Sequence, residues 1–116
     1  MYGDDGNDLV AGGDGNDIVK GNNGADLLFG DAGNDTMDGG TGNDTFYGGV
    51  GNDVFLIFDT DGAGKDSFAD FVSGQDHIDL TNVTVSSGLG TTVVLLSSGD
   101  SIIATDGHQW AVGDFV

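Results

Sequence analysis

Cysteine, proline, glutamate and arginine are absent from this chain of 116 residues, and only Lys20 and Lys65 carry a full positive charge. Without cysteine the chain cannot build a disulfide framework, although this absence leaves its redox compartment open. With 20 acidic residues, the net charge at pH 7 is −18. Because such a chain repels phosphate groups, we expect no nucleic acid among its partners.

Long apolar runs are also missing from the sequence. No run of roughly 18 apolar residues occurs, so no transmembrane helix is expected. The N-terminus lacks the basic stretch and the apolar core of a cleaved Sec signal peptide, so any export would use another signal. His77 and His108 have no nucleophile or metal-ligand spacing around them, and no catalytic residue is predicted.

Aspartate and glycine dominate what the chain does contain. All 20 acidic residues are Asp, and 23 residues are Gly. Asp favours turns, whereas Glu favours helices, so the acidic residues are expected in turns rather than on a helical face. Composition alone would also fit a disordered acidic linker.

A period of nine residues favours a folded repeat protein over the linker. Between residues 3 and 56, six consecutive units read G-x-x-G-x-D-x-U-x, where U is apolar. Two degenerate units follow within residues 61–79, after an insertion of four residues. The apolar positions of the regular units are Val10, Val19, Leu28, Met37, Phe46 and Phe55.

In these residues the chain resembles the RTX, or hemolysin-type, family of calcium-binding nonapeptide repeats. The resemblance implies an all-β fold, a right-handed parallel β-roll over residues 1–80, with a C-terminal β cap over 81–116. Each unit would form six residues of turn and three of strand, and two units would complete one coil. Each repeat Asp would then lie about 4.8 Å from the Asp 18 residues later, and a cation between them would offset their repulsion.

The family pattern also implies a ligand set for each calcium ion. The second and fourth carbonyls and the Asp of one turn would combine with the first and third carbonyls and the Asp of the turn two units later. The four expected sites are Asp4, Gly6, Asp8, Gly21, Asn23 and Asp26; Gly13, Gly15, Asp17, Gly30, Ala32 and Asp35; Asn22, Gly24, Asp26, Gly39, Thr41 and Asp44; and Asp31, Gly33, Asp35, Gly48, Val50 and Asp53.

Two further sites would bring the expected number of ions from four to about six. A fifth site would use Gly40, Gly42, Asp44, Asp61, Ala63 and Asp66. A sixth would pair Asp53 with Asp76, but Phe71 and Ser73 depart from the repeat there and weaken the prediction.

The apolar core of such a roll is thin, so we expect metal to complete the fold. At a Kd near 10⁻⁴ M, roughly 10 mM calcium contributes about 2.7 kcal/mol per site. Four to six sites would contribute on the order of 11 to 16 kcal/mol, which is comparable with the whole stability of a domain. We therefore expect calcium to switch the chain between an expanded and a folded state.

The leading functional interpretation is a calcium-triggered folding and secretion module. The chain would stay unfolded inside a bacterial cell, pass through the type I secretion machinery and fold in extracellular calcium. The end, residues 113–116, resembles the acidic-then-apolar tail of type I substrates. Tyr2-Gly3 resembles the end of a preceding unit, so we expect a non-catalytic C-terminal part of a larger protein whose upstream domain it helps to fold.

Two alternatives belong to other classes of binding protein. A polysaccharide-binding auxiliary module, or an adhesin segment, would need a row of aromatic or cationic side chains, and Phe29, Tyr47 and Lys20 provide only a sparse one. An ice-binding face would need Thr at the third position of each turn, and only Thr41 meets that requirement.

Overall fold

The computed structural model describes residues 2–58, 64–81, 85–88, 90–91, 93–96, 101–105 and 107–115. Nearly all of its regular structure is β, arranged in two sheets, and none of its described residues forms a helix long and apolar enough to cross a membrane. The elements are β1 (Leu9–Asp14), β2 (Ile18–Asn23), β3 (Leu27–Ala32), β4 (Thr36–Thr41), β5 (Thr45–Tyr47), β6 (Val54–Phe58), β7 (Lys65–Phe68), β8 (His77–Thr81), β9 (Val85–Ser87), β10 (Val93–Leu96), β11 (Ser101–Ala104) and the 3-10 turn η2 (Val112–Asp114).

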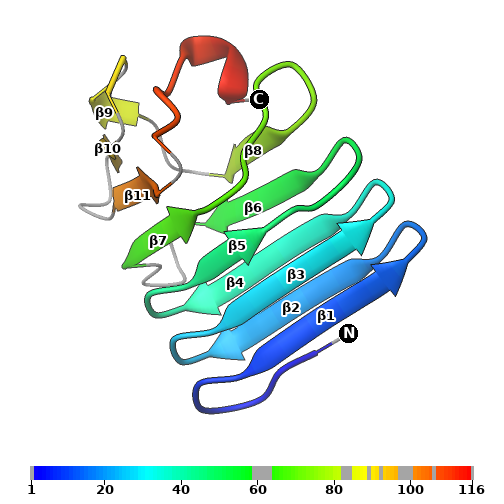
Figure 1. Ribbon diagram of the computed structural model, residues 1–116. Helices are drawn as coiled ribbons and strands as arrows, with labels where there is room; N and C mark the ends of the chain where they lie inside the picture. Colours follow the sequence, from blue (N-terminus) through cyan, green and yellow to red (C-terminus); the bar gives the residue numbers. More distant parts are fainter. Residues whose placement is uncertain are drawn as a thin grey trace.

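The chain passes from one sheet to the other with every repeat unit (Figure 1). Strands β1, β3, β5 and β7 are neighbours in one sheet, and β2, β4, β6 and β8 form the other. All neighbouring pairs within these two sets are parallel, and Leu28 pairs with Val10, 18 residues earlier. The expected parallel β-roll with two units per coil is therefore confirmed.

The first four strands are longer than the repeat pattern predicts. We expected three strand residues per unit, but β1 to β4 contain six each. Pairing continues past the repeat boundary, where Gly13 lies opposite Asp31 and Asp14 opposite Ala32. The expectation of six-residue turns was wrong because the first three positions of a unit can still form ladder hydrogen bonds with the coil above.

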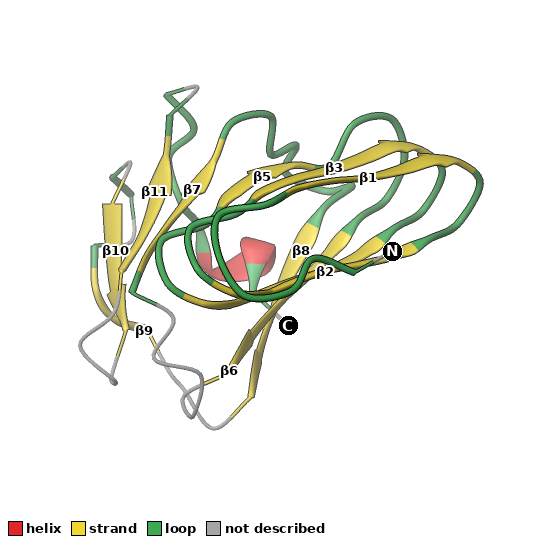
Figure 2. Ribbon diagram, turned by 90° about the horizontal axis from the view of Figure 1, so that it is seen from below, coloured by secondary structure: helices red, strands yellow, loops and turns green. Residues whose placement is uncertain are grey.

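The core is a single column of apolar side chains between the two sheets. Figure 2 shows the sheets as facing layers joined by turns at both edges. The apolar residue of each regular unit points inward and is at most 5% exposed. Toward the C-terminal end the column becomes aromatic, with Phe46 stacked on Phe68 and Phe55 edge-on to both.

The C-terminal part extends one sheet and covers the last coil. Strand β11 pairs in parallel with β7, and β10 and β9 follow in antiparallel order. Trp110 is fully buried, with its ring 5.4 Å from Phe68 and 4.8 Å from Phe71. Short apolar runs between Ser/Gly turns in the sequence of this part predict strands that include residues 102–104 and 110–112; the first is present in β11, but Val112 begins η2. Val83, also expected in a strand, lies outside the described residues.

Candidate metal sites

The repeat Asp residues form two columns, one at each edge of the roll. Within a column, the backbone N–H of one Asp donates to Oδ1 of the Asp in the next coil. The donor to acceptor distances are 2.8 Å for Asp8 to Asp26, 2.9 Å for Asp26 to Asp44, 3.0 Å for Asp44 to Asp66, 2.8 Å for Asp17 to Asp35, 2.9 Å for Asp35 to Asp53 and 3.1 Å for Asp53 to Asp76. The columns therefore place acidic side chains from successive coils directly beside each other.

The second carboxylate oxygen of five of these residues is buried without a partner among the described groups. Oδ2 of Asp17, Asp26, Asp35, Asp44 and Asp53 accepts no hydrogen bond from any described group. A buried carboxylate in this position is unfavourable unless a cation or donor compensates it. The repeat spacing thus creates a regular series of uncompensated oxygens.

Burial also changes the acidity of the columns. It raises the pKa of Asp44 and of Asp53 to about 6, and the neighbouring carboxylates of each column add to the rise. The pKa values of Asp26, Asp35 and Asp76 are also raised, and in each case desolvation by burial is the largest cause. Carboxyl groups whose ionised form is destabilised in this way favour a nearby positive charge.

Backbone carbonyls converge on the same oxygens across a glycine. A Cβ atom added to Gly30 would lie 2.5 Å from both Asp35 Oδ2 and the carbonyl oxygen of Gly48. At Gly12 the equivalent distances, to Asp17 Oδ2 and the Gly30 carbonyl, are both 3.0 Å. A carboxylate of one turn and the first carbonyl of the turn two units later therefore share one small space, which only glycine leaves open.

This oxygen set fits a hard cation better than a transition metal. Calcium takes six to eight oxygen ligands, including backbone carbonyls, at about 2.3 to 2.6 Å. Among the described residues, no three Asp or His side chains gather at one point. Side chains alone therefore do not form a metal cage here, and a bound ion would need the carbonyls.

The carbonyls of the expected ligand sets differ in how freely they can bind. The carbonyl of the third residue in a nine-residue unit already accepts a backbone hydrogen bond from the N–H of the fourth residue in the unit two units earlier. These bonds join Gly6 to Asn23 (2.8 Å), Gly15 to Ala32 (2.7 Å), Gly24 to Thr41 (2.9 Å) and Gly33 to Val50 (2.8 Å). Only the second lone pair of such a carbonyl remains for a cation, whereas the first-position carbonyls lie beside Oδ2.

The fourth-position carbonyls point from one coil toward the next. A Cβ atom on Gly24 would overlap the carbonyl oxygen of Gly6, and one on Gly51 would overlap that of Gly33. Gly24 adopts a φ of +123°, a conformation in which other residues are strained. Glycine at this position therefore lets carbonyls approach the next turn closely.

The two degenerate units continue both columns. Asp66 reaches Asp44 across the insertion, although two of the expected ligands of the fifth site, Asp61 and Ala63, lie outside the described residues. Asp53 and Asp76 are brought together even though the sequence weakened that pairing. Oδ2 of Asp76 accepts the Val72 N–H at 2.8 Å, as Asp8 Oδ2 accepts the Asp4 N–H at 2.9 Å.

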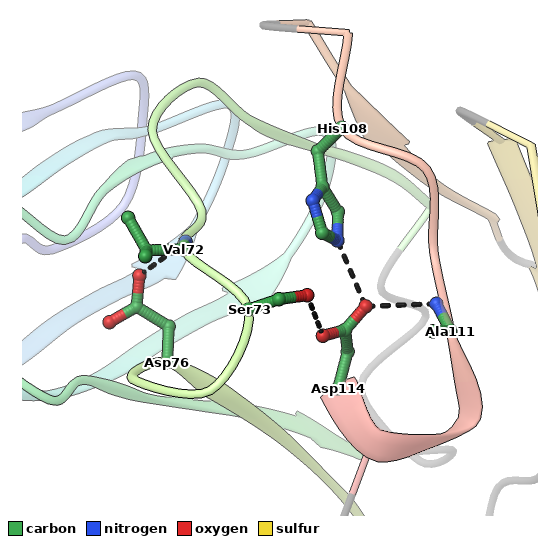
Figure 3. Close-up of polar contacts among 6 residues, drawn as sticks. All are labelled: Val72, Ser73, Asp76, His108, Ala111 and Asp114. Atoms are coloured by element: carbon green, nitrogen blue, oxygen red, sulfur yellow. Dashed lines mark hydrogen bonds and ion pairs between the residues drawn. The ribbon is translucent and has the colours of Figure 1, made fainter.

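A polar network that the sequence did not suggest lies beside this last turn (Figure 3). Ser73 Oγ donates to Asp114 Oδ1, and His108 Nε2 lies 2.9 Å from Asp114 Oδ2. Burial opposes ionisation of Asp114, but the hydrogen bonds from Ser73, the Ala111 N–H and His108 hold its pKa below the ordinary value. Because Ser73 binds Asp114 and not His108 in this network, these contacts do not form a serine–base pair.

Comparison with known proteins points to one family. A family model for the RTX calcium-binding nonapeptide repeat matches residues 2–37 and 20–55. A solution structure of the AlgE6R3 subunit of the mannuronan C5-epimerase from Azotobacter vinelandii is similar over 98% of this chain and 80% of its own. The two are 29% identical, with a TM-score of 0.76. No curated protein sequence matches the chain.

Proposed function

The repeat region of this chain belongs to the RTX family of calcium-binding nonapeptide repeats, and from that premise we propose that the chain is a calcium-dependent folding module of a secreted protein. The family match confirms the expectation that calcium is its cofactor. The proposal adds that calcium decides whether the chain folds, that four to six ions bind, and that the expected ligand sets hold them.

One observation carries this proposal: five buried Oδ2 atoms without a partner recur along the two Asp columns. In a chain with a net charge of −18, each of them opposes folding unless it is compensated. Bound calcium would supply a divalent charge and coordination for these oxygens. Oδ1 of Asp26, Asp35, Asp44 and Asp53 meanwhile holds the backbone of the preceding coil and so fixes the orientation of the carboxylate.

The same arrangement supports export before folding. At the low calcium of a cytosol the columns stay uncompensated, so the chain would remain expanded and able to pass through the type I secretion machinery. Millimolar calcium outside the cell would then fold residues 1–80, and residues 81–116 would cap the last coil through β11 and Trp110. We propose that the chain itself is not catalytic and that it assists an upstream domain.

A calcium titration followed by circular dichroism tests the proposal. In chelator we expect a largely unfolded chain, and in millimolar calcium a cooperative gain of β signal. Isothermal titration calorimetry should find four to six ions per chain. A chain that is equally folded in chelator would refute calcium-dependent folding.

A specific observation keeps polysaccharide binding as a second candidate. Phe29 and Tyr47 stack at 4.8 Å on neighbouring strands, and Tyr47 is 37% exposed. The similar solved structure belongs to an epimerase named for mannuronan, a polysaccharide. Binding to immobilised mannuronan that is lost in Tyr47→Ala, with folding intact, would favour this function; no binding by the wild-type chain would exclude mannuronan.

A further inference from the structure

The chain contains a single Asn-Gly pair, Asn23–Gly24, at the end of β2. Asn-Gly is chemically reactive in flexible chains, because the nitrogen after Asn can attack the side-chain amide carbon and glycine has no Cβ to hinder the approach. In all other regular units the residue before this glycine is Asp, Ala, Thr or Val. The third unit alone therefore carries a self-reactive amide in its turn.

The folded roll restrains every group that this reaction needs. The Gly24 N–H donates to the Thr41 carbonyl at 2.9 Å, and Asn23 Nδ2 donates to Asp5 Oδ1 at 2.7 Å. Thr41 Oγ1 also donates to Asn23 Oδ1 at 3.0 Å. The attacking nitrogen is thus held by Thr41 of the next coil, and the side-chain amide is held between Asp5 and Thr41, so neither group is free to react until these contacts open.

We propose that Asn23 is a modification site that is reactive in the calcium-free chain and protected in the folded roll. Gly24 N forms a bond to Asn23 Cγ and gives its proton to the solvent, while the Cγ–Nδ2 bond breaks and ammonia leaves with a proton from the solvent. Water then opens the five-membered succinimide at either carbonyl. The balance is one water consumed and one ammonia released, and the product is aspartate or isoaspartate.

Either product damages the turn, to different degrees. Aspartate places a carboxylate oxygen where Nδ2 now donates to Asp5, so a 2.7 Å hydrogen bond becomes a repulsion between like charges. Isoaspartate adds a methylene group to the main chain. The Asn23 N–H now donates to the Asp4 carbonyl at 3.2 Å, and its carbonyl accepts from Gly6 at 2.8 Å. A longer main chain cannot keep both bonds and the nine-residue register.

The consequence is a limit on how long the chain can remain calcium-free and still fold. This rests on the proposed calcium-dependent folding, because only an unfolded interval exposes Asn23 to the reaction. The Asn23 carbonyl is also an expected ligand of the first site. The modification would therefore weaken calcium binding between the first and the third repeat units.

The experiment incubates the whole chain at neutral pH in three buffers: millimolar calcium, chelator, and chelator with urea. Peptide mapping by mass spectrometry measures conversion at Asn23, and circular dichroism records the fold in each buffer. We expect conversion in calcium to be at least about tenfold slower than in urea, which corresponds to ~1.4 kcal/mol of local opening. Asn34, which is followed by Asp35 and whose Oδ1 accepts the Asn52 N–H at 2.9 Å, is an internal control that should convert far less in every buffer.

The outcomes separate this inference from the proposed function. A chain that stays folded in chelator refutes calcium-dependent folding, and the comparison of calcium with urea then still decides whether the fold protects Asn23. Equal conversion in the folded and urea-unfolded chains overturns the inference. Asn23→Gln should abolish the conversion. Isolated isoaspartate chains should require more calcium than the unmodified wild-type chain, and an unchanged midpoint would refute the structural damage.

Discussion

Replacement of Asp35 by Asn should cost more stability in calcium than replacement of Asp8. Asp35 is 1% exposed and lies in the middle of its column, bound to Asp17 on one side and to Asp53 on the other. Asn keeps the shape of the side chain and one carbonyl oxygen that can accept the Asp17 N–H, but it removes the negative charge from both expected sites. Asp8 belongs to one expected site alone.

The difference can be estimated from the number of sites. When calcium is about 100 times above Kd, each site contributes about 2.7 kcal/mol. Asp35→Asn should therefore lower the free energy of unfolding by up to about 5 kcal/mol and Asp8→Asn by up to about 3 kcal/mol. Because total stability is roughly 5–15 kcal/mol, the first variant should need clearly more calcium to fold.

Urea unfolding at a fixed millimolar calcium concentration measures these differences, and a calcium titration gives the midpoints. Asp14→Asn is the matched control, since Asp14 is an exposed residue at the end of β1, lies outside the expected ligand sets and loses the same charge. Equal losses for Asp8→Asn and Asp35→Asn would refute the sharing of Asp35 by two sites. A similar loss for Asp14→Asn would show that net charge, and not the columns, controls folding.

Three further changes have defined outcomes. Burial raises the pKa values of Asp44 and Asp53 to about 6, so protonation of these residues stabilises the metal-free fold at low pH, and this stabilisation is lost as pH rises through 6. Protons therefore compete with calcium, and the calcium midpoint should rise as pH falls from 7 to 5. A constant midpoint would contradict the role of Asp44 and Asp53 as ligands. Magnesium at the same concentration should fold the chain poorly, because it prefers a smaller octahedral shell and keeps its water; equal β signal in magnesium would exclude a calcium-sized site. Trp110→Ala should cost about 3–5 kcal/mol in urea unfolding, whereas Val112→Ala, at a residue 77% exposed, should cost little; equal effects would show that the last coil does not need this cover.

The repeat pattern predicted the roll well because each unit repeats the same local choices. Glycine permits the turn, one apolar residue fills the core, and Asp recurs at a fixed place, so the pairing of Leu28 with Val10 and Phe46 follows from the spacing. The length of the strands did not follow from it, because hydrogen bonds between coils continue through positions where the side-chain pattern suggests a turn.

The C-terminal part was harder to predict because its contacts are long-range. Nothing near Ser73 in the sequence indicates that it would bind Asp114, 41 residues later. The pairing of Asp53 with Asp76 was similarly obscured, because Phe71 and Ser73 break the repeat, and each of them also contacts the C-terminal segment. The ligand assignments remain a prediction from the family pattern, supported by the convergence of Oδ2 and first-position carbonyls.

The stacking of whole coils also determines how the roll would respond to a pulling force. Each coil of 18 residues binds mainly to the coils beside it, and Asp-to-Asp hydrogen bonds join neighbours along both edges. The last coil is held further by Trp110 and Asp114, so force applied to the two ends should detach coils from the N-terminal side. Each detached coil would release roughly 60 Å of extended chain. Extension through the regular coils would therefore proceed in equal increments of length, one for each coil that opens, and the coils that contain the insertion would release a longer segment.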